Sequence, residues 1–221
     1  MNNKKALIYF EKLGEGNIDI KATKINPSND FSDMDAKFIM KYANKESRIL
    51  DLASGTGIII NKIHEKVKEI VAIEKIKKFT KFIEKKDNIK VFHQDIFQFE
   101  TIEKFDLVLM FGILHYLNED ESIFLLKKYK NYLKQKDGIL IIKQQFGVYD
   151  DVAVSSFINQ NNTDCAQLEN VAYVSQYRFL DKEMDTLRKI GFKIIEVVDI
   201  YPPECNRWDN THFYAIVAGL D

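Results

Sequence analysis

The sequence predicts a single α/β domain, with a largely parallel sheet covered by helices on both faces. From Arg48 to Val217, short apolar runs alternate with segments of helical periodicity, which is the pattern of parallel strands joined by helices. The run FDLVLMF at 105–111 is almost wholly apolar, as expected of a strand buried on both faces. The 221 residues, 46% of them hydrophobic, suffice for one large core.

Each element has its own signal. The run RILDLA predicts a first strand, and Asn118 with Glu121 three residues later predicts a helix that starts with a capping box. Gly191 is the expected C-cap of a late helix. The predicted strands are 48–53, 69–74, 89–94, 105–111, 138–145, 192–200 and 211–219, and the predicted helices between them include 57–68, 75–86 and 181–190.

Two segments interrupt the alternation and divide the domain 1–221 into parts. Residues 1–47 contain helical patterns at 6–13 and 33–44 and are expected to form a helical lid. Residues 146–179 are rich in amides and aromatics, and an insertion of this length usually serves function. We therefore expect a cofactor-binding core at 48–145, a substrate-covering insertion at 146–179, and a last helix with two strands at 180–221.

Composition excludes several classes of protein. The net charge is −1 with both signs interspersed, so no basic face for nucleic acid is expected. Lysines are dense at 75–86, but apolar residues at helical spacing make them the solvated face of the predicted helix. Cys165 and Cys205 have no metal-ligand spacing, and no apolar run is long enough to cross a bilayer. We predict a cytoplasmic protein with no metal, no nucleic-acid partner and no membrane partner.

The segment DLASGTG, residues 51–57, directly follows the first predicted strand and opens a helix. Gly55 and Gly57 allow a tight turn and a close approach of backbone to a ligand, and the helix presents free N–H groups there. A glycine pair after a strand is by itself a weak signal, because it often marks only a turn.

Residues at the ends of the next strands strengthen this signal. Glu74 ends the second strand 23 residues after Asp51, close to the interval at which an acidic side chain reaches a ribose diol. Asp95 and Ile96 follow the third strand, where they are expected to contact an adenine ring. Phe111-Gly112 ends the fourth strand. All these positions lie at carboxyl ends of strands, where open parallel sheets bind ligands.

With these motifs the chain resembles class I S-adenosylmethionine-dependent methyltransferases over nearly its whole length. The matching segments are ILDLASGTG, VAIEK, QDIFQF, FDLVLMFGILHYL and LKQKDGILIIKQQF. The resemblance implies strand order 3-2-1-4-5-7-6 with the seventh strand antiparallel, S-adenosylmethionine as cofactor and S-adenosylhomocysteine as product. Ser54 stands where many members have glycine. The residues expected at the cofactor are Tyr9, Asp51, Ala53, Ser54, Gly55, Gly57, Glu74, Lys75, Asp95, Ile96, Phe111 and Gly112.

A methyl acceptor is expected at the same edge, beyond the later strands. His115 and Tyr116 follow the fourth strand and are the candidate catalytic residues, because imidazole suits proton transfer near neutrality. A histidine that only packs under the loop is an equally open reading. The candidate acceptor-binding residues, from the insertion and from the connection before the last strand, are Gln145, Tyr149, Tyr177, Arg178, Arg207, Trp208, Asn210 and His212.

Several functions remain open at this point. A nicotinamide-dependent dehydrogenase is disfavoured, because Ile58 to Ile60 follow Gly57 without the third glycine of its loop. The C-terminal segment is similar to small-molecule methyltransferases of bacterial capsule and lipopolysaccharide gene clusters, including those linked to O-methyl phosphoramidate. We therefore expect methyl transfer to O or N of a small polar, sugar-like or phosphorylated acceptor. The alternatives are a non-catalytic cofactor-binding or partner module and a tRNA or protein methyltransferase.

Overall fold

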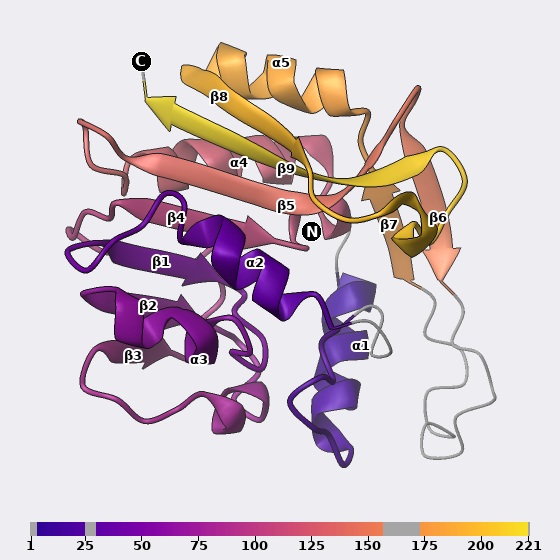
Figure 1. Cartoon of the computed structure of the whole chain (residues 1–221). Coiled ribbons are helices and arrows are strands. Elements are labelled where there is room, and N and C mark those ends of the chain that lie inside the picture. Colours follow the sequence, from indigo (N-terminus) through magenta and orange to yellow (C-terminus); the bar gives the residue numbers. More distant parts are fainter. Residues whose placement is uncertain (1–3, 25–29, 157–172, 221) are drawn as a thin grey trace.

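A computed structural model describes residues 4–24, 30–156 and 173–220 of the chain. Its main feature is a seven-stranded sheet of order β3-β2-β1-β4-β5-β9-β8 (Figure 1). β1 to β5 pair in parallel, and β9 runs antiparallel to both β5 and β8. The strands are β1 Arg48–Leu52, β2 Glu69–Ile73, β3 Ile89–Phe92, β4 Leu107–Phe111, β5 Ile139–Gly147, β8 Phe192–Asp199 and β9 Thr211–Leu220. The predicted strand order and the antiparallel seventh strand are confirmed.

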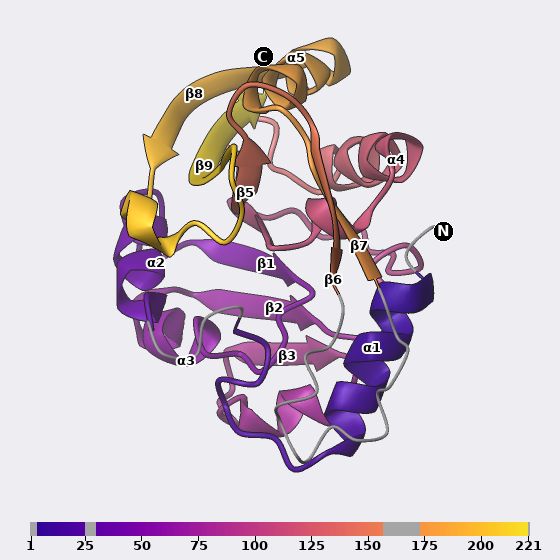
Figure 2. The same ribbon diagram turned by 90° about the vertical axis from the view of Figure 1, so that its right-hand side faces the viewer.

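Helices cover both faces of the sheet, as the alternating pattern predicts. Figure 2, which looks from the side, shows α2 and α3 on one face and α4 and α5 on the other. The helices are α1 Lys4–Glu15, α2 Ser32–Ile39, α3 Ile60–Ile63, α4 Glu119–Lys130 and α5 Leu180–Ile190. The capping box of Asn118 and Glu121 starts α4, and Gly191 ends α5 with a φ of 88°, as predicted.

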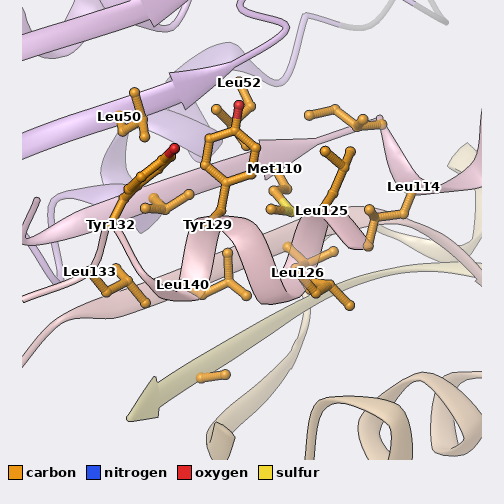
Figure 3. Packing of buried hydrophobic residues seen from close by; sticks show 14 of the residues in the cluster. Leu50, Leu52, Met110, Leu114, Leu125, Leu126, Tyr129, Tyr132, Leu133 and Leu140 are labelled. Atoms are coloured by element: carbon orange, nitrogen blue, oxygen red, sulfur yellow. The ribbon is translucent and has the colours of Figure 1, made fainter. Parts of the chain in front are cut away.

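The core under α4 also holds part of the ligand-facing edge in place. Leu125, Leu126 and Tyr129 of α4 pack on side chains of β1, β4 and β5 (Figure 3). The Tyr129 hydroxyl donates to the backbone oxygen of Ile96 at 2.7 Å. This hydrogen bond ties the loop after β3 to the core, so that its position is fixed relative to β4.

Two predicted helices are shorter than the sequence pattern indicates. Within 57–68 only α3 is α-helical, followed by a 3₁₀ turn at His64–Lys66, and within 75–86 only a 3₁₀ turn at Phe79–Phe82 forms. The chain becomes extended at Ile83, with φ −70° and ψ 128°, and this residue is buried against the glycine loop. A continued helix would also bring several lysines onto neighbouring turns, where like charges repel.

The predicted insertion contains regular structure that its irregular pattern does not predict. β6, Val152–Ser156, and β7, Tyr173–Tyr177, form a separate antiparallel pair. The part of the insertion at 157–172, including Cys165, lies outside the described residues. In Figure 1, α1 and this pair lie at the edge to which the arrowheads of β1, β4 and β5 point. No helix in the described part of the chain is long and apolar enough to span a membrane.

Candidate active site

A cavity of about 320 Å³ opens at the carboxyl edge of the parallel strands, within the size range of small-molecule sites. Its wall is built from the loops after β1 to β4, the end of β5, the N-terminal segment, β7 and the connection between β8 and β9. Fourteen of the residues predicted for the site lie on this wall: Asp51, Ala53, Ser54, Gly55, Glu74, Lys75, Asp95, Ile96, Phe111, Gly112, His115, Tyr116, Gln145 and Tyr177.

The glycine loop after β1 needs its glycines for backbone geometry and for packing. Gly55 and Gly57 have φ values of 56° and 71°, in the left-handed region that glycine tolerates best. A Cβ on Gly55 would lie 2.9 Å from Thr23 Oγ1, and one on Gly57 would lie 2.3 Å from Ile83 Cγ1. The close neighbours of these glycines are therefore protein side chains, and Gly57 does not line the cavity.

Glu74 is held in a fixed orientation by the backbone. Its Oε2 accepts a hydrogen bond from the Gly55 N–H at 2.9 Å, and its Oε1 accepts one from the Ile76 N–H at 2.8 Å. The residue is buried, and burial raises the pKa of its carboxyl. Each carboxylate oxygen keeps a second lone pair, so Glu74 can accept two further hydrogen bonds at the cavity.

Asp51 adds a second buried carboxylate to the same wall. None of the described residues hydrogen-bonds to its side chain. Burial, together with the negative charge of nearby Glu74, raises the pKa of Asp51 to about 7, and Lys143 opposes the shift. Two desolvated acidic groups make this part of the cavity suited to a ligand that carries positive charge.

The loop after β3 presents Asp95 and Ile96 as predicted. Asp95 Oδ1 accepts a hydrogen bond from the Phe97 N–H at 2.9 Å, so this carboxylate caps its own turn. Its Oδ2 lies 3.3 Å from Lys75 Nζ. Asp95 therefore has a structural role and still lies on the cavity wall.

His115 is fully buried behind the end of β4. Its ring packs against Tyr116, with centroids 4.0 Å apart, and stacks on Tyr177 at 5.3 Å. Its Nδ1 lies 3.4 Å from Gln144 Oε1. Burial, together with the positive charges of Arg178 and Arg207, lowers the pKa of His115 to about 3, and the contact with Gln144 opposes this shift. The imidazole is therefore neutral near pH 7.

The sequence reasoning missed a polar cluster on the opposite side of the wall. Lys143 Nζ donates to Asp35 Oδ2 and to the Tyr201 hydroxyl, both at 2.7 Å, and that hydroxyl donates to Asp35 Oδ1 at 2.6 Å. Lys24 lies nearby, and burial lowers its pKa. A lysine inside the apolar run ILIIK of β5 was the available signal.

The remaining predicted residues lie off the cavity wall. Phe10 of α1 lines the cavity where Tyr9 does not, and Tyr149 is 77% exposed. The guanidinium of Arg178 is fully engaged inside the protein, by Glu183, Ser122 and the carbonyls of Leu114 and Leu117.

The connection before β9 has its own internal contacts. Trp208 donates to the Tyr177 hydroxyl at 3.2 Å, and the Arg207 guanidinium lies over the Trp208 ring. His212 bonds Asn206 and Asp199. Asn210 accepts from the Tyr149 N–H. This connection therefore reaches the cavity through Tyr201 and Cys205, rather than through the residues predicted from it.

The described residues include no group of three or more histidine, cysteine, aspartate or glutamate side chains placed to hold a metal ion. The polar wall combines the carboxylates of Asp51 and Glu74 near the glycine loop with the ion pair of Lys143 and Asp35 and the amides of Gln144 and Gln145 at β5. Charged groups of both signs therefore line the cavity.

The seven-stranded order with its antiparallel β9 is that of the methyltransferase fold. Residues 49–136 match the model of a methyltransferase domain. This match supports a methyltransferase domain over these residues.

Solved structures of methyltransferases share the fold at low sequence identity. DhpI in complex with S-adenosylhomocysteine is 16% identical, with 99% of this chain and 96% of that chain covered and a TM-score of 0.75. The 1,6-didemethyltoxoflavin-N1-methyltransferase of Burkholderia thailandensis is 12% identical, with coverages of 96% and 84% and a TM-score of 0.72. The glycopeptide N-methyltransferase MtfA is 15% identical, with coverages of 88% and 92% and a TM-score of 0.67. No curated protein matches the sequence significantly.

Proposed function

We propose that this chain transfers the methyl group of S-adenosylmethionine to an oxygen or nitrogen atom of a small polar metabolite. The observation that carries the proposal is the orientation of Glu74, whose carboxylate is fixed by Gly55 and Ile76 on the wall that also holds Asp51. Glu74 would bind the ribose hydroxyls, and Asp51 would lie at the positively charged methionine end. Asp95 and Ile96 would contact the adenine.

The acceptor side of the proposal is a sugar-like or phosphorylated metabolite, such as a surface-polysaccharide precursor. It is supported by the similarity of the C-terminal segment to capsule-cluster enzymes, and by the small cavity. The similar Burkholderia thailandensis enzyme was solved with a small molecule, 1,6-didemethyltoxoflavin, beside S-adenosylhomocysteine. His115, Tyr116, Gln145 and Tyr177 line the same cavity and would contact the acceptor.

The cofactor part is tested by calorimetric titration of S-adenosylhomocysteine into the wild type and the Glu74→Gln variant. Loss of charged hydrogen bonds to the ribose should weaken binding about 10- to 100-fold. Glu65→Gln is the matched control, because Glu65 is exposed and lies before the amino end of β2. Equal affinities for the wild type and Glu74→Gln would refute the assignment.

Turnover is tested with methyl-labelled S-adenosylmethionine and a small-molecule extract of bacterial cells. The proposal predicts label in a low-molecular-weight product. Tight binding of the cofactor with no labelled product, or label in RNA or protein when these are supplied, would contradict it.

A further inference from the structure

Several buried polar atoms on the cavity wall have no partner within the described protein. They are Ser54 Oγ, His115 Nε2, Gln144 Nε2 and Gln145 Oε1. His115 and Gln144 are each only 1% exposed. Because an unsatisfied buried polar atom is costly, these atoms are candidates for contact with a ligand.

Two of these atoms come from residues that fix each other's hydrogen-bonding roles. Gln144 Oε1 accepts a hydrogen bond from the His115 backbone N–H at 3.2 Å. A backbone N–H can only donate, so this contact assigns the oxygen of the amide and leaves its NH₂ group free. The same oxygen lies 3.4 Å from His115 Nδ1, which places the ring proton on Nδ1 and leaves Nε2 as an acceptor.

The wall at this point therefore offers one hydrogen-bond donor, Gln144 Nε2, and one acceptor, His115 Nε2. A hydroxyl group satisfies both, because it donates through its hydrogen and accepts through a lone pair. An alkylammonium group has no lone pair, and the positive charges of Arg178 and Arg207 near His115 disfavour it. An oxyanion has no proton to give to Nε2.

We propose that His115 and Gln144 recognise a neutral hydroxyl group of the acceptor, and that its oxygen is the atom that becomes methylated. This inference rests on the proposed function and extends it by choosing a neutral hydroxyl over an ammonium group and by adding Gln144 as a specificity-determining residue. The hydroxyl oxygen forms its bond to the methyl carbon as the C–S bond breaks, and the electron pair of that bond stays on sulfur. The hydroxyl proton, hydrogen-bonded to His115 Nε2 in the bound state, is released to water as the new bond forms.

The experiment uses the full chain labelled with ¹⁵N-histidine and saturated with S-adenosylhomocysteine, after calorimetry has established that this ligand binds. The His115 signals are assigned from their loss in the His115→Asn variant. In the wild type, Nδ1 should be protonated and Nε2 bare. Glycerol, a neutral hydroxyl probe, should shift the Nε2 signal, whereas inorganic phosphate and methylammonium should not.

Gln144→Glu tests the donor, because it keeps the oxygen near His115 and replaces the NH₂ group with a second oxygen. The glycerol concentration that gives half of the shift should rise about tenfold or more. Gln135→Glu makes the same change at an exposed site before the amino end of β5 and should match the wild type.

A proton on Nε2 in place of Nδ1, an Nε2 shift with phosphate or methylammonium but not glycerol, or an unchanged midpoint in Gln144→Glu would each overturn the proposal. The first two measurements use the wild type and do not depend on the folding of a variant. Failure of S-adenosylhomocysteine to bind would instead refute the proposed function, and calorimetry detects that outcome separately.

Discussion

Replacement of Asp51 by asparagine should stabilise the ligand-free protein above neutral pH and weaken its binding of S-adenosylmethionine. Burial, together with the negative charge of Glu74, raises the pKa of Asp51 from 3.8 to about 7. The unfolded chain ionises this group from about pH 3.8 and the folded protein only near pH 7, so folding stability falls across this interval and levels off above it. A shift of about three pKa units corresponds to a loss of folding stability of about 4 kcal/mol at most. Hydration of the open cavity makes this loss smaller.

The assay is urea denaturation of the ligand-free wild type and Asp51→Asn at pH 4, 6 and 8. Relative to the wild type, the free energy of unfolding of the variant should be little changed at pH 4 and higher by about 2–4 kcal/mol at pH 8. Asp87→Asn, at an exposed aspartate, is the control and should show no such gain. An Asp51→Asn variant that is no more stable at pH 8, or that binds S-adenosylmethionine as tightly as the wild type, would refute the reasoning.

Three other substitutions test the surroundings of the cavity by denaturation. Lys143→Met should lower the free energy of unfolding by about 3–5 kcal/mol at pH 7, because it leaves buried Asp35 without its cation. Asp35→Asn in the same chain should recover part of this loss. A loss below about 1 kcal/mol would contradict the prediction. The pKa of His115 is lowered to about 3, so the free energy of unfolding of the wild type should fall by about 2 kcal/mol relative to that of His115→Gln between pH 6.5 and 5. Parallel pH profiles of the two proteins would exclude this. Gly57→Ala should lower the free energy of unfolding by about 2–4 kcal/mol, because residue 57 has a positive φ and the added Cβ would collide with Ile83. An unchanged free energy of unfolding would contradict that packing.

The sheet was predictable because its strands are marked by short apolar runs that end in turn residues. Asn118 and Gly191 mark helix ends through local chemistry alone, and both predictions are confirmed. The prediction of a helix at 75–86 is wrong, because a periodic apolar pattern does not show where the chain must bend. Ile83 leaves the helical conformation to pack on Gly57, and that contact comes from a loop distant in sequence.

The cofactor side of the cavity was more predictable than the acceptor side for the same physical reason. Asp51 and Glu74 follow their strands directly, so the sheet alone places them at one edge. The acceptor side depends on long connections whose side-chain directions the sequence does not determine. The sequence suggests that Arg178 binds a ligand, but its guanidinium is hydrogen-bonded to Glu183 and to nearby backbone carbonyls. The sequence places Lys143 inside a strand and does not show that its side chain lines the cavity.

The central claim is that the cavity bordered by β1, β2 and β4 binds the adenosyl cofactor. A crystal structure of the protein grown with S-adenosylhomocysteine tests it most directly. The account predicts the ribose hydroxyls within hydrogen-bonding distance of the Glu74 carboxylate and the adenine beside Ile96. A ligand bound elsewhere on the molecule, or a cavity that stays free of ligand at saturating concentration, would contradict it.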